Sequence, residues 1–219
     1  MPNLFCPLCL SADLSHFYSD ARRHYQRCQR CQLVFVDSRQ HLPLAEEKAI
    51  YDLHQNALDD PGYLSFLSRL AEPLLARLPA NSQGLDFGCG PGPALAELCK
   101  SAGHRVKLYD PFFANFPEHL QQTYDFILAT EVVEHLREPR CEFATLFGLL
   151  KPGGWLGIMT KLVKNAEAFA KWHYKNDQTH IAFFSQASFN WLAAHYDCQI
   201  EFIGTDVIIL QRNLHQHNN

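Results

Sequence analysis

Four cysteines near the N-terminus have the residue type and spacing of a metal site. They form two C-x-x-C pairs, Cys6 with Cys9 and Cys28 with Cys31, and eighteen residues separate the pairs. Thiolates at this spacing are typical zinc ligands, and zinc binds four of them in a tetrahedron. Four cysteines leave no open position for a substrate, so we predict a structural zinc. The metal would supply folding energy to a ribbon over residues 1–40, which is too short for its own core.

A glycine-rich turn follows a short apolar strand in LDFGCGPGP, residues 85–93. Gly88, Gly90 and Gly92 would let a ligand approach the backbone closely at the start of a helix. The dinucleotide fingerprint needs a sixth-place glycine, which is a proline here. Asp110 comes twenty residues after Gly90, behind the next strand, where a carboxylate can bind two ribose hydroxyls. The turn therefore predicts a nucleoside-containing cofactor without choosing which one.

A third group of polar residues lies in TEVVEH, residues 130–135. One helical turn would place Glu131, Glu134 and His135 on the same face. His180 can join them only if the segment 172–184 folds back as a lid. Either histidine could take a proton from a substrate, because imidazole titrates near neutral pH. The alternative for His180 is a structural hydrogen bond beneath a loop.

The elements that must position these groups alternate between strand and helix. Apolar runs predict strands at Leu85–Phe87, Arg105–Tyr109, Asp125–Ala129 and Trp155–Val163, with a hairpin at Gln199–Ile203 and Asp206–Gln211. Helical patterns span Pro93–Ala102, Glu138–Leu150 and Ser185–Tyr196. This order predicts an α/β, doubly wound, mostly parallel sheet over residues 83–213. Residues 41–82 form a helical connector, with an amphipathic helix at Gly62–Leu78 that Pro73 should kink or divide.

Composition and charge exclude several classes of protein. The chain has 219 residues, 47% of them hydrophobic, and a formal net charge of −4. Its apolar content excludes a disordered chain, and no apolar run is long enough to span a membrane. The N-terminus lacks the pattern of a signal peptide, so we expect a cytoplasmic protein, in which disulfides would be unusual. The negative charge argues against nonspecific nucleic-acid binding without excluding a nucleic-acid substrate.

Four ordered blocks resemble a class I S-adenosyl-L-methionine-dependent methyltransferase, and the resemblance covers residues 84–211. The blocks are LDFGCGPGP, YDP, YDFILATEVVEHL and LLKPGGWLGIMT. The resemblance implies that Asp86 and the three glycines hold the methionine and ribose part of the cofactor, and that Asp110 grips the ribose hydroxyls. It also implies that Thr130 and Glu131 lie beside the methionyl group or the substrate. A nucleotide-binding Rossmann domain of another kind is the alternative.

The resemblance has one departure, in the region of the third strand. Only fourteen residues separate Asp110 from Asp125, where the family usually has a helix, a strand and an adenine-contacting turn. We therefore expect a shortened third-strand region. Phe112, Phe113 and Phe116 could stack on the adenine there, or they could be core residues.

The block E-x-x-E-H with a distant histidine is also similar to small-RNA 2′-O-methyltransferases. Members of that family bind a divalent metal through two Glu and two His, which match Glu131, Glu134, His135 and His180. Carboxylates with imidazoles suit Mn²⁺, Fe²⁺ or Zn²⁺. In many other class I methyltransferases an E-H pair at this place only shapes the substrate side, so a second metal remains one of two interpretations.

The function expected from these features is methyl transfer to a small molecule or sugar. His135, His180 and Glu134 are the candidate catalytic residues, acting directly or through a metal. A ribbon before a methyltransferase also resembles the front part of deoxysugar C-methyltransferases. The alternatives are an RNA or protein methyltransferase that uses the ribbon to recognise its target, and a cofactor-binding regulatory module without catalysis.

Overall fold

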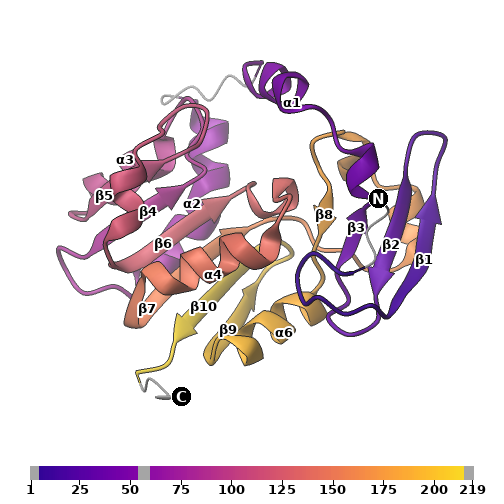
Figure 1. Cartoon of the computed structure of the whole chain (residues 1–219). Coiled ribbons are helices and arrows are strands. Elements are labelled where there is room, and N and C mark those ends of the chain that lie inside the picture. The colour runs from indigo at the N-terminus through magenta and orange to yellow at the C-terminus, as the bar shows by residue number, and fades with distance from the viewer. Residues whose placement is uncertain (1–4, 54–59, 215–219) are drawn as a thin grey trace.

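The computed structural model describes residues 5–53 and 60–214, which fold into two lobes (Figure 1). The larger lobe has a six-stranded sheet in the order β5-β4-β6-β7-β10-β9. Its strands are β4 (Gln83–Phe87), β5 (Arg105–Tyr109), β6 (Tyr124–Thr130), β7 (Leu150–Met159), β9 (Cys198–Ile203) and β10 (Val207–Arg212). The first four strands of that order run parallel, while β10 is antiparallel to β7 and β9. The prediction of a mostly parallel sheet is confirmed.

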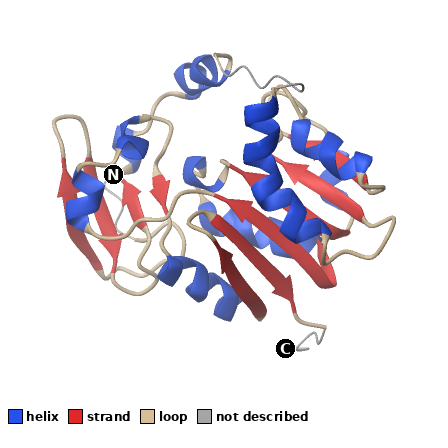
Figure 2. Ribbon diagram, turned by 180° about the vertical axis from the view of Figure 1, so that it is seen from behind, coloured by secondary structure: helices blue, strands red, loops and turns tan. Residues whose placement is uncertain are grey.

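Helices cover both faces of this sheet (Figure 2). They are α2 (Pro61–Leu75) and α3 (Ala94–Ser101) on one face, and α4 (Pro139–Leu149) and α6 (Gln186–His195) on the other. Successive residues of β6 point to opposite faces, as strand geometry requires. Phe126 packs with side chains of α2 and α3, whereas its neighbour Ile127 packs with those of α4 and α6. The sheet is therefore doubly wound, as predicted.

Three local features differ from or refine the sequence-based expectation. Pro73 does not divide α2, which runs without interruption from Pro61 and ends two residues after the proline, at Leu75. The strand predicted at Trp155–Val163 begins and ends earlier, since residues 151–154 already belong to β7, whose register against β6 shifts there. Between β5 and β6 the chain forms only the 3₁₀ turn η2 (Pro117–Gln121). The shortened third-strand region is confirmed.

The smaller lobe is a four-stranded sheet whose last strand comes from far along the chain. Its order is β1-β2-β3-β8, with β1 (Leu14–Ser19), β2 (His24–Cys28), β3 (Val34–Val36) and β8 (Ala182–Phe183). Residues 5–40, which we call the cysteine ribbon, supply the first three strands. Val34 pairs with Phe183, and the N–H of Val36 donates to the carbonyl of Ile181 over 2.9 Å. The segment between β7 and α6, with α5 (Ala166–Ala170) and the 3₁₀ turn η4 (His173–Asn176), is thereby attached to the ribbon.

Helix α1 (Leu44–Tyr51) lies above the gap between the lobes in both views (Figures 1 and 2). It belongs to the predicted connector, of which residues 54–59 lie outside the described part. The Glu47 carboxylate on α1 pairs with Arg137, which also donates to the carbonyl of Leu42 over 2.6 Å. Among the described residues, no helix is long and apolar enough to cross a membrane.

Candidate active site

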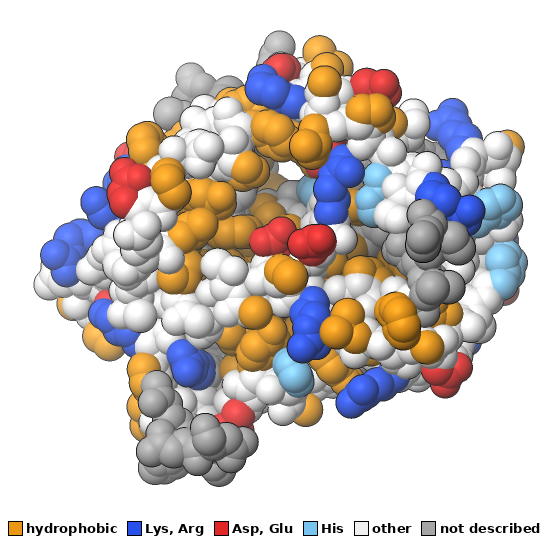
Figure 3. Space-filling view, in the orientation of Figure 1, with side chains coloured by type: hydrophobic (Ala, Val, Ile, Leu, Met, Phe, Trp, Pro, Cys, Tyr) orange, Lys and Arg blue, Asp and Glu red, His pale blue; other side chains and the backbone are white. Residues whose placement is uncertain are grey.

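The carboxyl ends of the parallel strands β4, β5 and β6 open into a cavity of about 890 Å³ between the two lobes. Figure 3 shows this face hollowed between the lobes, with acidic side chains beside the hollow. Six carboxylates and two cations line the cavity: Glu47, Asp86, Asp110, Glu131, Glu142, Asp177, Arg137 and Lys161. Open α/β sheets bind their ligands at this edge. The excess of negative charge favours a ligand that carries a positive charge.

The glycine-rich turn forms one wall of the cavity directly after β4. Gly88 and Gly90 have backbone φ angles of +76° and +61°, which residues other than glycine rarely adopt. The backbone of this turn, including Gly92, lines the cavity. Asp86 lies just before the turn and is buried. Burial, with the nearby charge of Asp110, raises the pKa of Asp86 to about 7.

The turn gives a testable prediction at Gly88. A Cβ atom there would lie 2.4 Å from Cγ2 of Val132, in addition to the unfavourable φ. Gly103 has a φ of +89° but no atom within 4 Å of such a Cβ, so it isolates the backbone cost. We expect Gly103→Ala to cost about 1–2 kcal/mol, and Gly88→Ala about 1–3 kcal/mol more. Urea unfolding of both variants measures the difference, and equal costs would contradict the predicted clash.

Asp110 organises the neighbouring loop with both carboxylate oxygens. Oδ2 accepts the N–H of Gly90 over 3.0 Å, and Oδ1 accepts those of Phe112 and Phe113 over 2.8 and 3.1 Å. A carboxylate can accept about four hydrogen bonds, so it retains capacity for a ligand hydroxyl. Phe112 and Phe113 also line the cavity. Phe116, the third candidate for adenine stacking, is 46% exposed and is not among the lining residues.

Thr130 and Glu131 follow at the end of β6 and line the same cavity. The Thr130 hydroxyl is buried and has no hydrogen-bond partner among the described residues. A buried hydroxyl without a partner is costly, which indicates that a ligand completes its hydrogen bonding. Glu131 has a φ of +52°, an uncommon backbone conformation for a residue other than glycine. Burial raises the pKa of the Glu131 carboxyl.

The helical turn expected for residues 131–135 is wrong in part. Only the 3₁₀ turn η3 (Val133–His135) forms, and the left-handed Glu131 lies outside it. The Glu134 side chain instead points into the protein, where it is completely buried. The hydroxyls of Thr160 and Tyr174 donate to the two carboxylate oxygens of Glu134. The Tyr174 hydroxyl also lies 3.2 Å from Oε2 of Glu131. Glu131 and Glu134 are therefore linked through one tyrosine.

The buried carboxyl of Glu134 predicts a pH dependence of stability. Burial, and then the charge of Glu131, raise the pKa of Glu134 to about 8, whereas an unfolded glutamate titrates at about 4.3. Between these values the folded state binds the additional proton, so the stabilisation from this group falls as pH rises. We expect Glu134→Gln to gain stability relative to the wild type between pH 6 and pH 8.5. Urea midpoints at both pH values measure this, with exposed Glu97→Gln as control; an unchanged difference would contradict it.

His135 and His180 lie side by side, with ring centroids 4.7 Å apart. Nδ1 of His135 donates to the carbonyl of Thr179 over 3.1 Å, and Nδ1 of His180 donates to that of Tyr174 over 2.7 Å. A carbonyl only accepts, so in each neutral ring the proton is on Nδ1 and the basic lone pair is on Nε2. Burial lowers the pKa of His180, which keeps this ring neutral at neutral pH. Both residues line the cavity.

The structure thus brings together most of the side chains that the sequence singled out. One ligand atom each from Glu134, His135 and His180 lies within 4.8 Å of the others, and Glu131 does not belong to this group. His180 reaches it because residues 172–184 join the ribbon sheet through β8. The expected lid is therefore part of the smaller lobe.

Several cavity residues were not predicted from the sequence. The Tyr51 ring, on α1, packs edge-on against the His135 ring with their centroids 5.3 Å apart. Its centroid also lies 5.7 Å from that of the Phe112 ring. The Lys161 ammonium lies 5.1 Å above the Tyr174 ring. Nothing local in the sequence indicates the contacts of Tyr51, because they join segments that are far apart in the chain. Asp110, by contrast, could be found from its spacing after the glycine turn.

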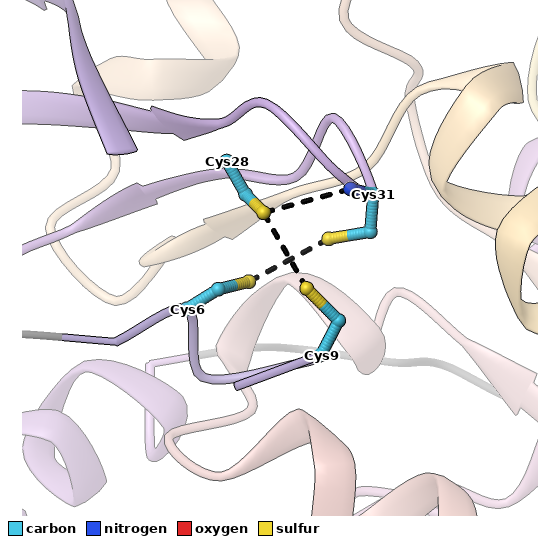
Figure 4. A group of neighbouring side chains, drawn as sticks. All are labelled: Cys6, Cys9, Cys28 and Cys31. Carbon is cyan, nitrogen blue, oxygen red and sulfur yellow. Dashed lines mark hydrogen bonds between the residues drawn. The ribbon is translucent and has the colours of Figure 1, made fainter. Parts of the chain in front are cut away.

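The four N-terminal cysteines point their thiols toward one another (Figure 4). Sγ of Cys6 lies 3.5 Å from that of Cys31, and Sγ of Cys9 lies 3.4 Å from that of Cys28. All four thiols are free, so disulfides do not account for the cluster. Zinc–sulfur bonds of about 2.3 Å in a tetrahedron would place sulfurs about 3.8 Å apart. The four side chains therefore fit the size of a zinc site.

The sheet order, the glycine turn and the cavity at the strand ends define the chain as a Rossmann-like, S-adenosylmethionine-dependent methyltransferase. It belongs to the family described as methyltransferase domain, whose model matches residues 60–201. That match begins within the predicted connector, at the residue before α2. Against curated proteins, no sequence matches.

Solved structures share this fold. The 1,6-didemethyltoxoflavin-N1-methyltransferase of Burkholderia thailandensis, with 1,6-didemethyltoxoflavin and S-adenosylhomocysteine bound, aligns with a TM-score of 0.55 at 15% identity. The alignment covers 91% of this chain and 99% of that one. An O-methyltransferase family protein from the same organism has a TM-score of 0.50 at 15% identity, over 76% of this chain and 62% of its own.

Proposed function

We propose that this chain transfers a methyl group from S-adenosylmethionine to a hydroxyl of a small molecule or sugar. The observation that carries the proposal is the pair His135 and His180, whose Nδ1 atoms donate to backbone carbonyls beside the predicted cofactor site. The bound cofactor supplies a methyl group that its sulfonium already activates. The protein must hold the acceptor in line with it and remove the acceptor's proton. Nε2 of His180 would accept that proton.

The residues around the cavity fit the cofactor in three ways. The turn at Gly88 and Gly90 leaves backbone accessible, Asp110 retains capacity for ribose hydroxyls, and the Thr130 hydroxyl has no hydrogen-bond partner in the described part of the chain. The carboxylates that line the cavity favour a sulfonium cation. We assign the adenine to Phe112 and Phe113, whose rings offer flat apolar faces at the shortened third-strand region.

A small acceptor is favoured over RNA or protein. A volume of about 890 Å³ matches the size of small-molecule pockets, about 300–1,000 Å³. The apolar side of the ribbon, including Leu8 and Phe35, packs into the same core as α4 and α6. The ribbon therefore uses that face inside the molecule. It contributes to the acceptor side through the segment that its sheet holds, in which Asp177 and His180 line the cavity. We propose that its four cysteines hold one structural zinc.

The second metal that the sequence raised remains an alternative for the same site. Glu134, His135 and His180 would hold it, because one ring nitrogen of each histidine and one carboxylate oxygen lie within 4.8 Å of one another. Histidine ligands typically donate their other ring N–H to a carbonyl, as both do here. A bound Mn²⁺, Fe²⁺ or Zn²⁺ would lower the pKa of an acceptor hydroxyl.

Cofactor binding tests the proposed function through Asp110. S-adenosylhomocysteine is expected to bind one to one, and Asp110→Ala should weaken it by about 1–3 kcal/mol, roughly 5- to 150-fold. Isothermal titration measures both values. Glu97→Gln also removes one negative charge, but from an exposed residue of α3, and should leave the affinity unchanged. Binding of NADH with comparable affinity, and none of S-adenosylhomocysteine, would contradict the proposal.

A further inference from the structure

Arg23 is a buried cation in the turn between β1 and β2 of the cysteine ribbon. Arg23 is only 5% exposed, and its guanidinium forms no ion pair with a carboxylate among the described residues. Burying an unpaired charge is costly unless hydrogen bonds compensate for it. The guanidinium has five N–H donors in a fixed planar arrangement, which lysine lacks. The partners of these donors therefore indicate what the residue does.

Four of the five donors go to backbone carbonyls of a single loop, residues 175–180. Nη1 donates to the carbonyls of His180 and Gln178 over 2.8 and 3.3 Å. Nη2 donates to the carbonyl of Asp177 over 3.0 Å and to that of Lys175. Nε donates to the Tyr25 hydroxyl over 3.1 Å, so every N–H has a partner. One arginine of the ribbon thus donates hydrogen bonds to four backbone carbonyls of the loop that carries His180.

Neighbouring contacts fix Arg23 and the loop in turn. The Asp20 carboxylate accepts the backbone N–H of Arg23 over 2.9 Å and lies 3.5 Å from the Lys175 ammonium. The His180 ring is anchored as well, because its Nδ1 donates to the carbonyl of Tyr174, the residue directly before the loop. The orientation of the His180 ring therefore depends on the path of the loop backbone, and that path depends on Arg23.

We propose that Arg23 is a positioning residue for methyl transfer: its guanidinium fixes the 175–180 loop so that Nε2 of His180 carries the lone pair and faces the acceptor side of the cavity. The inference rests on the proposed function for the role of His180. It assigns the ribbon a part in the reaction, because the β1–β2 turn reaches the active-site loop. Arg23 touches neither substrate nor cofactor.

The test uses the full-length protein labelled with ¹⁵N-histidine, and it needs no known acceptor. Long-range ¹H–¹⁵N correlation spectra report which ring nitrogen carries the proton, and His180→Gln assigns the signals of His180. We expect wild-type His180 to be protonated on Nδ1 alone. In Arg23→Met the signals should shift toward an average of the two tautomers, and in Arg23→Lys they should shift less. Arg22→Met, at the exposed neighbour, should leave them unchanged.

Zinc content and S-adenosylhomocysteine affinity show that each variant is folded, and both should equal the wild-type values. If Arg23→Met does not fold, Arg23→Lys carries the test. Transfer from labelled S-adenosylmethionine to an accepting metabolite fraction should fall on the order of 100-fold in Arg23→Met. Unchanged His180 signals in the folded Arg23 variants would overturn the inference. Altered signals with full transfer by His180→Gln would instead overturn the proposed function of His180.

Discussion

Purified protein is expected to contain close to one zinc ion per chain, and Cys28→Ser is expected to lose it. The physical reason is the closed cluster of four thiols, in which zinc binding supplies most of the folding energy, about 10–16 kcal/mol in small zinc peptides. The loss of zinc should also destabilise structure beyond the ribbon. Cys28 ends β2, and β3 pairs with β8 directly after His180. We therefore expect faster hydrogen exchange in β2, β3 and β8, and loosening of the active-site loop.

Metal analysis and hydrogen exchange measure this result, with Cys141→Ser as the control because that thiol is exposed and distant from the cluster in sequence. S-adenosylhomocysteine should still bind the Cys28→Ser variant, since the glycine turn and Asp110 belong to the larger lobe. Freshly purified wild-type protein without zinc would contradict the ribbon assignment.

The second large effect is expected at His180. His180→Gln should lower methyl transfer about 100- to 10,000-fold, the contribution typical of a general base, while cofactor affinity stays nearly unchanged. Because burial lowers the pKa of His180, the wild-type rate should fall only as pH drops below the ordinary histidine range. The readout is transfer from methyl-labelled S-adenosylmethionine to metabolite fractions of a cell extract.

His195→Gln, an exposed change on α6, is the control and should transfer at the wild-type rate. Assays with a chelator and with added Mn²⁺ separate the two versions of the site. Equal rates support direct proton removal, whereas a requirement for Mn²⁺ supports a metal on Glu134, His135 and His180. Wild-type transfer by His180→Gln under both conditions would contradict a role for this residue.

The larger lobe could be predicted from the sequence because its signals are local. Alternating strands and helices placed the glycine turn, Asp110 and Thr130 at the ends of consecutive parallel strands, and such ends meet at one edge of a sheet. The clustering of the four cysteines could be predicted equally well, since two C-x-x-C pairs leave few other interpretations. In each case a short motif carries the chemistry, and the spacing between motifs is typical of a known kind of site.

The acceptor side could not be predicted in the same way. The two-residue strand β8 carries no periodicity, yet it attaches the His180 loop to the ribbon. Arg23 and its carbonyl partners are more than 150 residues apart in the chain. The left-handed Glu131 broke the expected helical turn, because η3 begins only at Val133. These features depend on tertiary contacts, which override local patterns.

We expect one cavity to hold the methyl donor and both histidines, and a crystal structure with S-adenosylhomocysteine bound will show whether it does. We predict the ribose on Asp110, the amino-acid part along the turn at Gly88, and the sulfur facing Nε2 of His135 and His180 across room for an acceptor. A cofactor bound elsewhere, or with its sulfur directed away from the two histidines, would contradict a shared site for donor and acceptor.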